Sequence, residues 1–102
     1  MPKKNVNLQF DKSASQVYQV YKKCLKTENV DHFHYDDDVK VINVGTDTKF
    51  FGGFGMSLTV KVIPIEKNKC RVRIQATQQG LPFQMWVPKN KHILNNVLNA
   101  ID

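Results

Sequence analysis

Two neighbouring stretches of the chain alternate apolar and polar residues, and this alternation constrains the fold more than any other feature. Every second side chain is apolar in residues 57–62 and again in residues 70–76. A period of two residues is typical of strands that bury one face. The apolar side chains of both strands share a face if Val62 lies opposite Val72, which predicts an antiparallel hairpin in that register. The same register predicts a three-residue loop that ends at Asn68, a residue type that tolerates the left-handed conformation such loops need.

One helix is predicted before this hairpin and another after it. Ser13 and Gln16 fit a capping box, and from Ala14 onward apolar residues recur at intervals of three and four, which predicts a helix over 13–27. Pro88 suits the first turn of a second helix. The apolar stripe of this second helix consists of Ile93, Leu94, Val97, Leu98 and Ile101.

Three further strands complete the predicted sheet. Residues 5–10 alternate, and residues 30–44 are interpreted as two strands joined by a turn at 36–38, because aspartate side chains bond nearby backbone amides. A second turn is predicted over 45–48. The predicted fold class is α+β, an antiparallel sheet of about five strands in the order β-α-β-β-β-β-α, with both helices packed on one face. Residues 1–102 are expected to form a single domain.

The two cysteines and the lack of long apolar segments bear on the compartment. Cys24 and Cys70 belong to no CxxC pair and fall on predicted apolar faces. This favours free, buried thiols in a reducing compartment, and a disulfide between helix and sheet is the alternative. The chain shows no apolar run typical of a membrane span or a signal peptide. We therefore expect a cytoplasmic protein.

Charge is distributed unevenly along the chain. Six of the nine acidic residues lie between Glu28 and Asp47, where Lys40 is the single base, although the formal net charge of the whole chain is +6. The remainder is therefore strongly basic, which points to an anionic partner such as nucleic acid, a phosphorylated ligand or a membrane surface. The alternative is that the acidic segment folds against the basic surface and neutralises part of it.

Three cations gather on the outer face of the predicted hairpin. In the predicted register Lys61 lies opposite Arg73, and Arg71 follows on the same face. Like charges directly opposite each other destabilise a sheet by up to about 1 kcal/mol, so such a cluster needs an explanation. Lys61, Arg71 and Arg73 are therefore candidates for binding an anion. A solvated face, with aspartates of neighbouring strands as partners, is the alternative.

A glycine-rich segment carries three phenylalanines, Phe50, Phe51 and Phe54. Residues 53–56 resemble, in part, the first ribonucleoprotein signature of RNA-recognition motif domains, although Gly52 stands where that signature has a base. The alternative is that the paired glycines let the backbone bend while the phenylalanines fill the core.

Metal binding and catalysis have weak support in the sequence. His32, His34 and Asp36 would share one face of a strand, and His-x-His is a known ligand spacing. No further ligand follows in the sequence, so we expect no metal and no other cofactor. The chain contains no P-loop, nucleophile–base pair or other catalytic motif, which predicts that the protein is not an enzyme.

Two parts of the chain resemble START-like helix-grip domains. Residues 10–18 lead from a strand into a helix through small capping residues, followed by the pair Val17 and Tyr18. Residues 86–101 look like the closing helix of that fold. The chain is also similar to small uncharacterised bacterial proteins with a strand–helix–sheet–helix plan. The resemblance implies a reduced helix-grip fold and assigns no catalytic residues.

These observations lead to one main expectation and two alternatives. We expect a non-enzymatic binding domain whose basic sheet face contacts an anionic macromolecule or a membrane surface. One alternative is a small hydrophobic-ligand binder of reduced helix-grip type, and the other is a protein-interaction or homo-oligomeric module. The pocket of the ligand binder would be lined by Phe50, Phe51, Phe54, Phe83, Met85 and Trp86.

Overall fold

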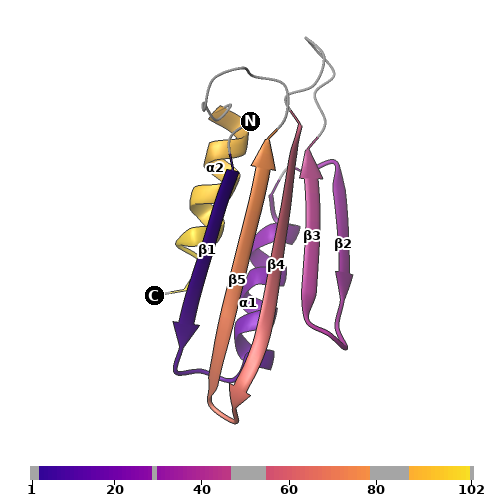
Figure 1. The fold of residues 1–102 in the computed structure, drawn as a ribbon. Helices are drawn as coiled ribbons and strands as arrows, with labels where there is room; N and C mark the ends of the chain where they lie inside the picture. The colour runs from indigo at the N-terminus through magenta and orange to yellow at the C-terminus, as the bar shows by residue number, and fades with distance from the viewer. Residues whose placement is uncertain (1–2, 29, 47–54, 79–87, 102) are drawn as a thin grey trace.

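A single antiparallel sheet with both helices on one side forms the structure. The computed structural model describes residues 3–28, 30–46, 55–78 and 88–101. The five strands within these ranges are ordered β1-β5-β4-β3-β2, and both helices lie behind the sheet in Figure 1. The predicted α+β class and element order are therefore confirmed. The elements are β1 (Lys3–Phe10), α1 (Ala14–Lys26), β2 (His32–Asp36), β3 (Val41–Thr46), β4 (Met56–Glu66), β5 (Lys69–Gln78) and α2 (Pro88–Leu98).

The central hairpin of β4 and β5 has the predicted register but a different turn. Val62 lies opposite Val72, as predicted. Glu66 pairs with Lys69 after a register shift between Pro64 and Glu66, so the loop contains two residues instead of three. The physical reason is that a proline has no N–H for the ladder, and a bulge at that place takes up the extra residue. The prediction of a left-handed Asn68 is also wrong, because Lys40 is the only non-glycine residue with a positive φ in the described ranges.

The turn between β2 and β3 lies slightly later than predicted. Asp36 still belongs to β2, where it pairs with Val41, and the turn is formed by residues 37–40. Lys40 has a φ of 57°, and its carbonyl oxygen accepts a hydrogen bond of 3.0 Å from the N–H of Val62. This contact ties the turn to β4. The turn predicted over 45–48 is wrong for its first two residues, because β3 continues through Thr46.

Helix α1 begins where its capping residue predicts. The hydroxyl oxygen of Ser13 accepts a hydrogen bond of 3.2 Å from the N–H of Gln16, which satisfies one of the free amides of the first turn. At the other end the N–H of Thr27 is bonded to carbonyls of the last turn. Five residues of the helix are buried against the sheet: Ala14, Val17, Tyr18, Tyr21 and Leu25.

Helix α2 begins at Pro88 and buries the predicted stripe. Ile93, Leu94 and Val97 are buried, and Leu98 is half-buried. His92 is exposed on the side of the helix opposite the apolar stripe. Of the two described helices, neither is long and apolar enough to span a bilayer.

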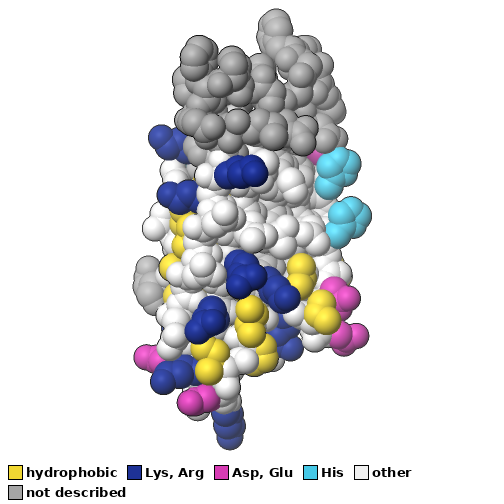
Figure 2. All heavy atoms as spheres, viewed as in Figure 1, with side chains coloured by type: hydrophobic (Ala, Val, Ile, Leu, Met, Phe, Trp, Pro, Cys, Tyr) yellow, Lys and Arg dark blue, Asp and Glu magenta, His cyan; other side chains and the backbone are white. Residues whose placement is uncertain are grey.

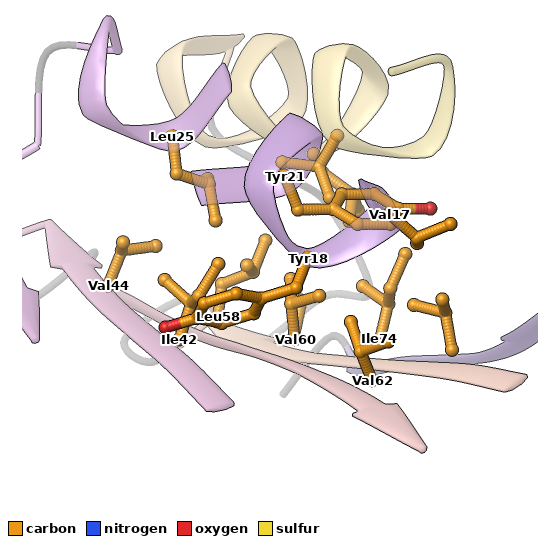
Figure 3. Packing of buried hydrophobic residues seen from close by; sticks show 14 of the residues in the cluster. Val17, Tyr18, Tyr21, Leu25, Ile42, Val44, Leu58, Val60, Val62 and Ile74 are labelled. Atoms are coloured by element: carbon orange, nitrogen blue, oxygen red, sulfur yellow. The ribbon is translucent and has the colours of Figure 1, made fainter. Parts of the chain in front are cut away.

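Two tyrosines of α1 lie in the core between helix and sheet (Figure 3). The hydroxyl of Tyr18 donates a hydrogen bond of 2.7 Å to Asp37 Oδ1 in the β2–β3 turn, and Lys22 Nζ lies 3.1 Å from the same oxygen. The hydroxyl of Tyr21 points to the other side of the core and has no hydrogen-bond partner within the described residues. Burial raises the pKa of Tyr21 to about 12.

The two tyrosines give a matched pair of substitutions. Tyr21→Phe removes a buried hydroxyl that makes no hydrogen bond, so we expect unchanged stability or a gain of up to about 1 kcal/mol. Tyr18→Phe removes the bond to Asp37, so we expect a loss of about 1 kcal/mol. Urea unfolding of both variants measures the difference. A larger loss for Tyr21→Phe than for Tyr18→Phe would contradict the assignment.

The raised pKa of Tyr21 predicts a loss of stability in alkali. The unfolded chain ionises this phenol near pH 10, whereas the folded chain keeps it neutral until about pH 12. The folded state therefore binds more protons in this window, and its stability falls as the pH rises, by about 1.4 kcal/mol per pH unit at most. Tyr21→Phe should flatten the slope of unfolding free energy against pH between these values. An unchanged slope would count against the burial of the hydroxyl.

Candidate functional site

The last row of the inner face of the sheet contains buried polar side chains. Thr46 of β3, Met56 of β4 and Gln78 of β5 lie side by side in the strand register, and all three side chains are buried. The inner-face positions of β3, β4 and β5 in the row before are occupied only by apolar residues. Two polar side chains are thus buried at one end of an otherwise apolar surface.

Asn90 of α2 joins these two polar side chains. The hydroxyl of Thr46 donates a hydrogen bond of 2.7 Å to Asn90 Oδ1, and Asn90 Nδ2 donates one of 2.8 Å to Gln78 Oε1. Thr46 Oγ1 itself accepts a bond of 3.0 Å from the N–H of Met56. The exposed fractions are 4% for Thr46, 2% for Asn90 and 0% for Gln78. We call Thr46, Gln78 and Asn90 the polar row.

The polar row fixes the start of α2 over the end of the sheet. Buried amides and hydroxyls are costly unless they are hydrogen-bonded, so this network holds the helix in the one position that satisfies it. A few polar groups on an apolar wall are also the usual composition of a ligand site. These residues were not among the predicted site residues, although Thr46 and Gln78 continue the inner-face alternation and Asn90 precedes Ile93 by one helical turn on the buried stripe.

The predicted pocket aromatics belong to the two connections that begin at this row. Phe50, Phe51 and Phe54 follow Thr46 in the sequence, and the other predicted lining residues follow Gln78. All of them, Phe83, Met85 and Trp86 included, lie outside the described residues, as do residues 53 and 54 of the segment that resembles the ribonucleoprotein signature. Their role as pocket residues stays a prediction.

A shallow hollow lies elsewhere, between α1 and the chain that follows α2. Its volume is about 240 Å³. Its walls are mainly aliphatic, with Lys12 and Gln16 at the start of α1 as the polar members. The hollow is separate from the polar row, because none of its lining residues belongs to that row. Its lining residues are Lys12, Gln16, Val17, Val20, Ala100 and Ile101.

The predicted cations share the outer face of the sheet. Lys61 lies opposite Arg73, and Arg71 lies opposite Ile63 in the next row of the same face. All three cations are exposed. Over the described ranges, no carboxylate lies within ion-pair distance of any of them, since the ion pair found there joins Lys22 to Asp37. The structure therefore brings the three predicted anion-binding residues together and leaves their charge unneutralised by described acids.

The acidic segment lies at the edge of the sheet beside this cluster, since Asp36 of β2 is in the same outer-face row as Lys61 and Arg73. Asp36 and Asp38 lie at the β2–β3 turn, and Asp37 turns to the helix side, where Tyr18 and Lys22 bind it. The hydrogen bond from Tyr18 is the main reason that the pKa of Asp37 is lowered, followed by the bond from Lys22. No described aspartate forms an ion pair with the three cations, whereas the ion pair of Asp37 with Lys22 neutralises part of the basic surface elsewhere, as the alternative predicted.

The cysteines and histidines show no site of their own. Both thiols are free, and burial raises the pKa of Cys24 and of Cys70, so neither is an activated nucleophile. His32 and His34 are exposed on the outer face of the edge strand β2. Within the described part of the chain, no three His, Cys, Asp or Glu side chains are arranged to hold a metal ion.

Comparison with known proteins shows a likeness in structure without one in sequence. No protein-family model matches the chain, and no curated protein matches it in sequence. The di-domain ARO/CYC BexL of the BE-7585A biosynthetic pathway is similar in structure, with a TM-score of 0.62 and 12% identity over 97% of this chain. The chain spans 42% of the length of that protein.

Two other proteins of similar structure match over a larger share of their own length. The Zhui aromatase/cyclase from Streptomyces sp. R1128 matches with a TM-score of 0.57 and 9% identity, over 94% of this chain and 83% of its own. Norcoclaurine synthase from Thalictrum flavum, in complex with dopamine and hydroxybenzaldehyde, matches with a TM-score of 0.56 and 12% identity, over 98% of this chain and 76% of its own. These likenesses confirm the helix-grip fold.

The same likenesses correct the expectation that the protein is not an enzyme. Aromatase/cyclases and norcoclaurine synthase are enzymes by name, and the fold that they share with this chain therefore carries catalysis. The absence of a short catalytic motif misled the prediction, because a site is defined by the geometry of its residues and can exist without a short sequence motif.

The polar row predicts an asymmetric response to two threonine substitutions. Thr46→Val keeps the side-chain shape but leaves Asn90 Oδ1 and the N–H of Met56 without this partner in a buried place, so we expect a loss of roughly 1–3 kcal/mol in unfolding free energy. Thr59→Val is the matched control, because the hydroxyl of Thr59 donates to Asn43 on the exposed outer face. We expect the control to change stability by less than about 0.5 kcal/mol in urea unfolding. Equal losses would contradict the role of the polar row.

Proposed function

We propose that the protein binds a small, largely apolar aromatic molecule between α2 and the inner face of the sheet, beside the polar row. The observation that carries the proposal is the hydrogen-bonded chain from Thr46 through Asn90 to Gln78 inside an apolar core. It supplies hydroxyl and amide groups at one end of an apolar surface. Ligand sites use this combination of groups to orient a molecule that has one polar end.

Two further observations support an aromatic ligand. One of the structurally similar proteins is recorded with dopamine and hydroxybenzaldehyde, two small aromatic molecules that carry hydroxyl groups. In this chain, the two connections that begin at the polar row hold Phe50, Phe51, Phe54, Phe83 and Trp86, whose rings would pack on such a molecule. The proposal is therefore that aromatic side chains cover the ring of the ligand while the polar row meets its hydroxyl group.

Thermal unfolding with a panel of phenols and naphthols tests the proposal. A ligand present at about 100 times its Kd stabilises a protein by about 2.7 kcal/mol, which raises the Tm of a domain of this size by on the order of 10 °C. Thr46→Val should reduce the rise, because it removes one hydroxyl of the polar row. Val20→Gln, which alters the wall of the separate hollow, should leave the rise unchanged.

The position of the ligand distinguishes the two places. In an NMR titration we expect the amide signals of Thr46, Gln78 and Asn90 to shift, with those of Lys12 and Gln16 unchanged. Shifts confined to Lys12 and Gln16 would place the ligand in the hollow and overturn the proposed site. No rise in Tm with any member of the panel would overturn the proposed function. Because structurally similar proteins are enzymes, each compound that binds should also be followed for chemical turnover.

A further inference from the structure

The types of side chain on the outer face of the sheet differ from one end of the strands to the other. Figure 2, in the same view as Figure 1, shows Lys and Arg side chains mixed with hydrophobic side chains toward the end of the face that carries the β4–β5 turn. The middle of the face is mostly neutral and polar in the same view. Cations and exposed aliphatic groups are thus concentrated together at one end.

Strand pairing explains how the two kinds of side chain interleave. Val41, Lys61 and Arg73 lie side by side in one row across β3, β4 and β5. Ile63 and Arg71 form the next row toward the turn. Each cation therefore has an aliphatic neighbour beside it or one row away.

Two more aliphatic side chains extend this surface into the hairpin ends. Ile65, at the bulge of β4, is 45% exposed, and Val39, in the β2–β3 turn, is 58% exposed. Neither packs in the core cluster, so the core does not account for them. The basic–aliphatic patch, as we define it, consists of Lys61, Arg71, Arg73, Val39, Val41, Ile63 and Ile65.

No described carboxylate at this end forms an ion pair with the three cations, although Asp36 of β2 shares the outer-face row of Lys61 and Arg73. Asp36 Oδ1 accepts hydrogen bonds from the N–H groups of Asp38 and Val39, at 3.0 and 3.4 Å. Asp37 binds Tyr18 and Lys22 on the helix side. Glu66 lies at the β4–β5 turn, where Lys69 is its strand partner.

We infer that the basic–aliphatic patch docks the protein on an anionic lipid bilayer. The side chains of Ile65 and Val39 would enter the boundary below the headgroups, while Lys61, Arg71 and Arg73 stay at the level of the lipid phosphates. Membrane attachment of this kind needs both apolar burial and charge, and the patch provides both in two rows of the sheet and the two hairpin ends beside them.

A nucleic acid fits the same patch less well. Phosphate backbones bind cations but offer nothing to exposed aliphatic side chains, and sheet faces that bind single strands use aromatic rings for stacking. On the described strands, Phe10, Phe33 and Tyr35 belong to the inner-face positions of the register, so the outer face presents no Phe, Tyr or Trp. The inference is independent of the proposed ligand, because it uses the opposite face of the sheet.

Vesicle co-sedimentation tests the inference with the full chain. We expect binding to phosphatidylcholine vesicles that contain phosphatidylserine, no binding to phosphatidylcholine alone, and weaker binding at about 0.15 M salt than at low salt. Removing the three cations together as Lys61→Gln, Arg71→Gln and Arg73→Gln should weaken binding roughly 100-fold, at about fivefold per cation.

A charge-matched variant separates the patch from net charge. Lys23→Gln, Lys26→Gln and Lys91→Gln remove the same number of cations from exposed positions on the two helices, behind the sheet. We expect this variant to keep most of its vesicle binding. Equal loss in both triple variants would overturn the inference, because net charge alone would then explain the binding.

The substitution Ile65→Ser separates a bilayer from a nucleic acid. We expect it to weaken vesicle binding severalfold at unchanged net charge, and circular dichroism checks that both triple variants and Ile65→Ser remain folded. Absence of vesicle binding at low salt would overturn the inference. Binding of duplex DNA or single-stranded RNA in preference to vesicles, unaffected by Ile65→Ser, would also overturn it in favour of a nucleic-acid surface.

Discussion

The antiparallel ladder between β4 and β5 is the constraint on which the rest of the structure depends. It occupies the centre of the sheet and pairs Val62 with Val72. Because side chains alternate between faces with a period of two, this register decides which residues of the hairpin face the helices. A slip of one residue in either strand would carry Lys61 or Arg73 into the core. The same ladder therefore creates the apolar inner face and the cationic outer face.

The two faces of the sheet carry different kinds of side chain. On the inner face, α1 closes most of the apolar surface, and the polar row sets the start of α2 at the end where two connections begin. On the outer face, cations and aliphatic side chains remain uncovered by described residues. A ligand that enters between sheet and helix and a surface that contacts the other side of the sheet can thus coexist, since the sheet itself separates them (Figure 1).

Sequence reasoning succeeded where one local pattern was sufficient and failed where two elements had to meet. The Ser13 cap, the start of α2 at Pro88 and the pairing of Lys61 with Arg73 follow from short patterns, and the structure confirms all three. The turn at 45–48 was predicted from residue types alone, but pairing with β4 extends β3 through Thr46. That mistake hid the polar row, because Thr46 was assigned to a turn instead of an inner-face position.

By itself, the sequence determined the fold class, the hairpin register and the face that each of its side chains occupies, since alternation and capping act over a few neighbouring residues. Tertiary structure alone decided which distant polar groups meet. Thr46, Gln78 and Asn90 are separated by many residues and come together only when α2 lies on the sheet. It also decided that Asp37 is held by Tyr18 and Lys22, and that no described carboxylate forms an ion pair with Lys61, Arg71 or Arg73. Such pairings depend on the packing of whole elements, which no local pattern records.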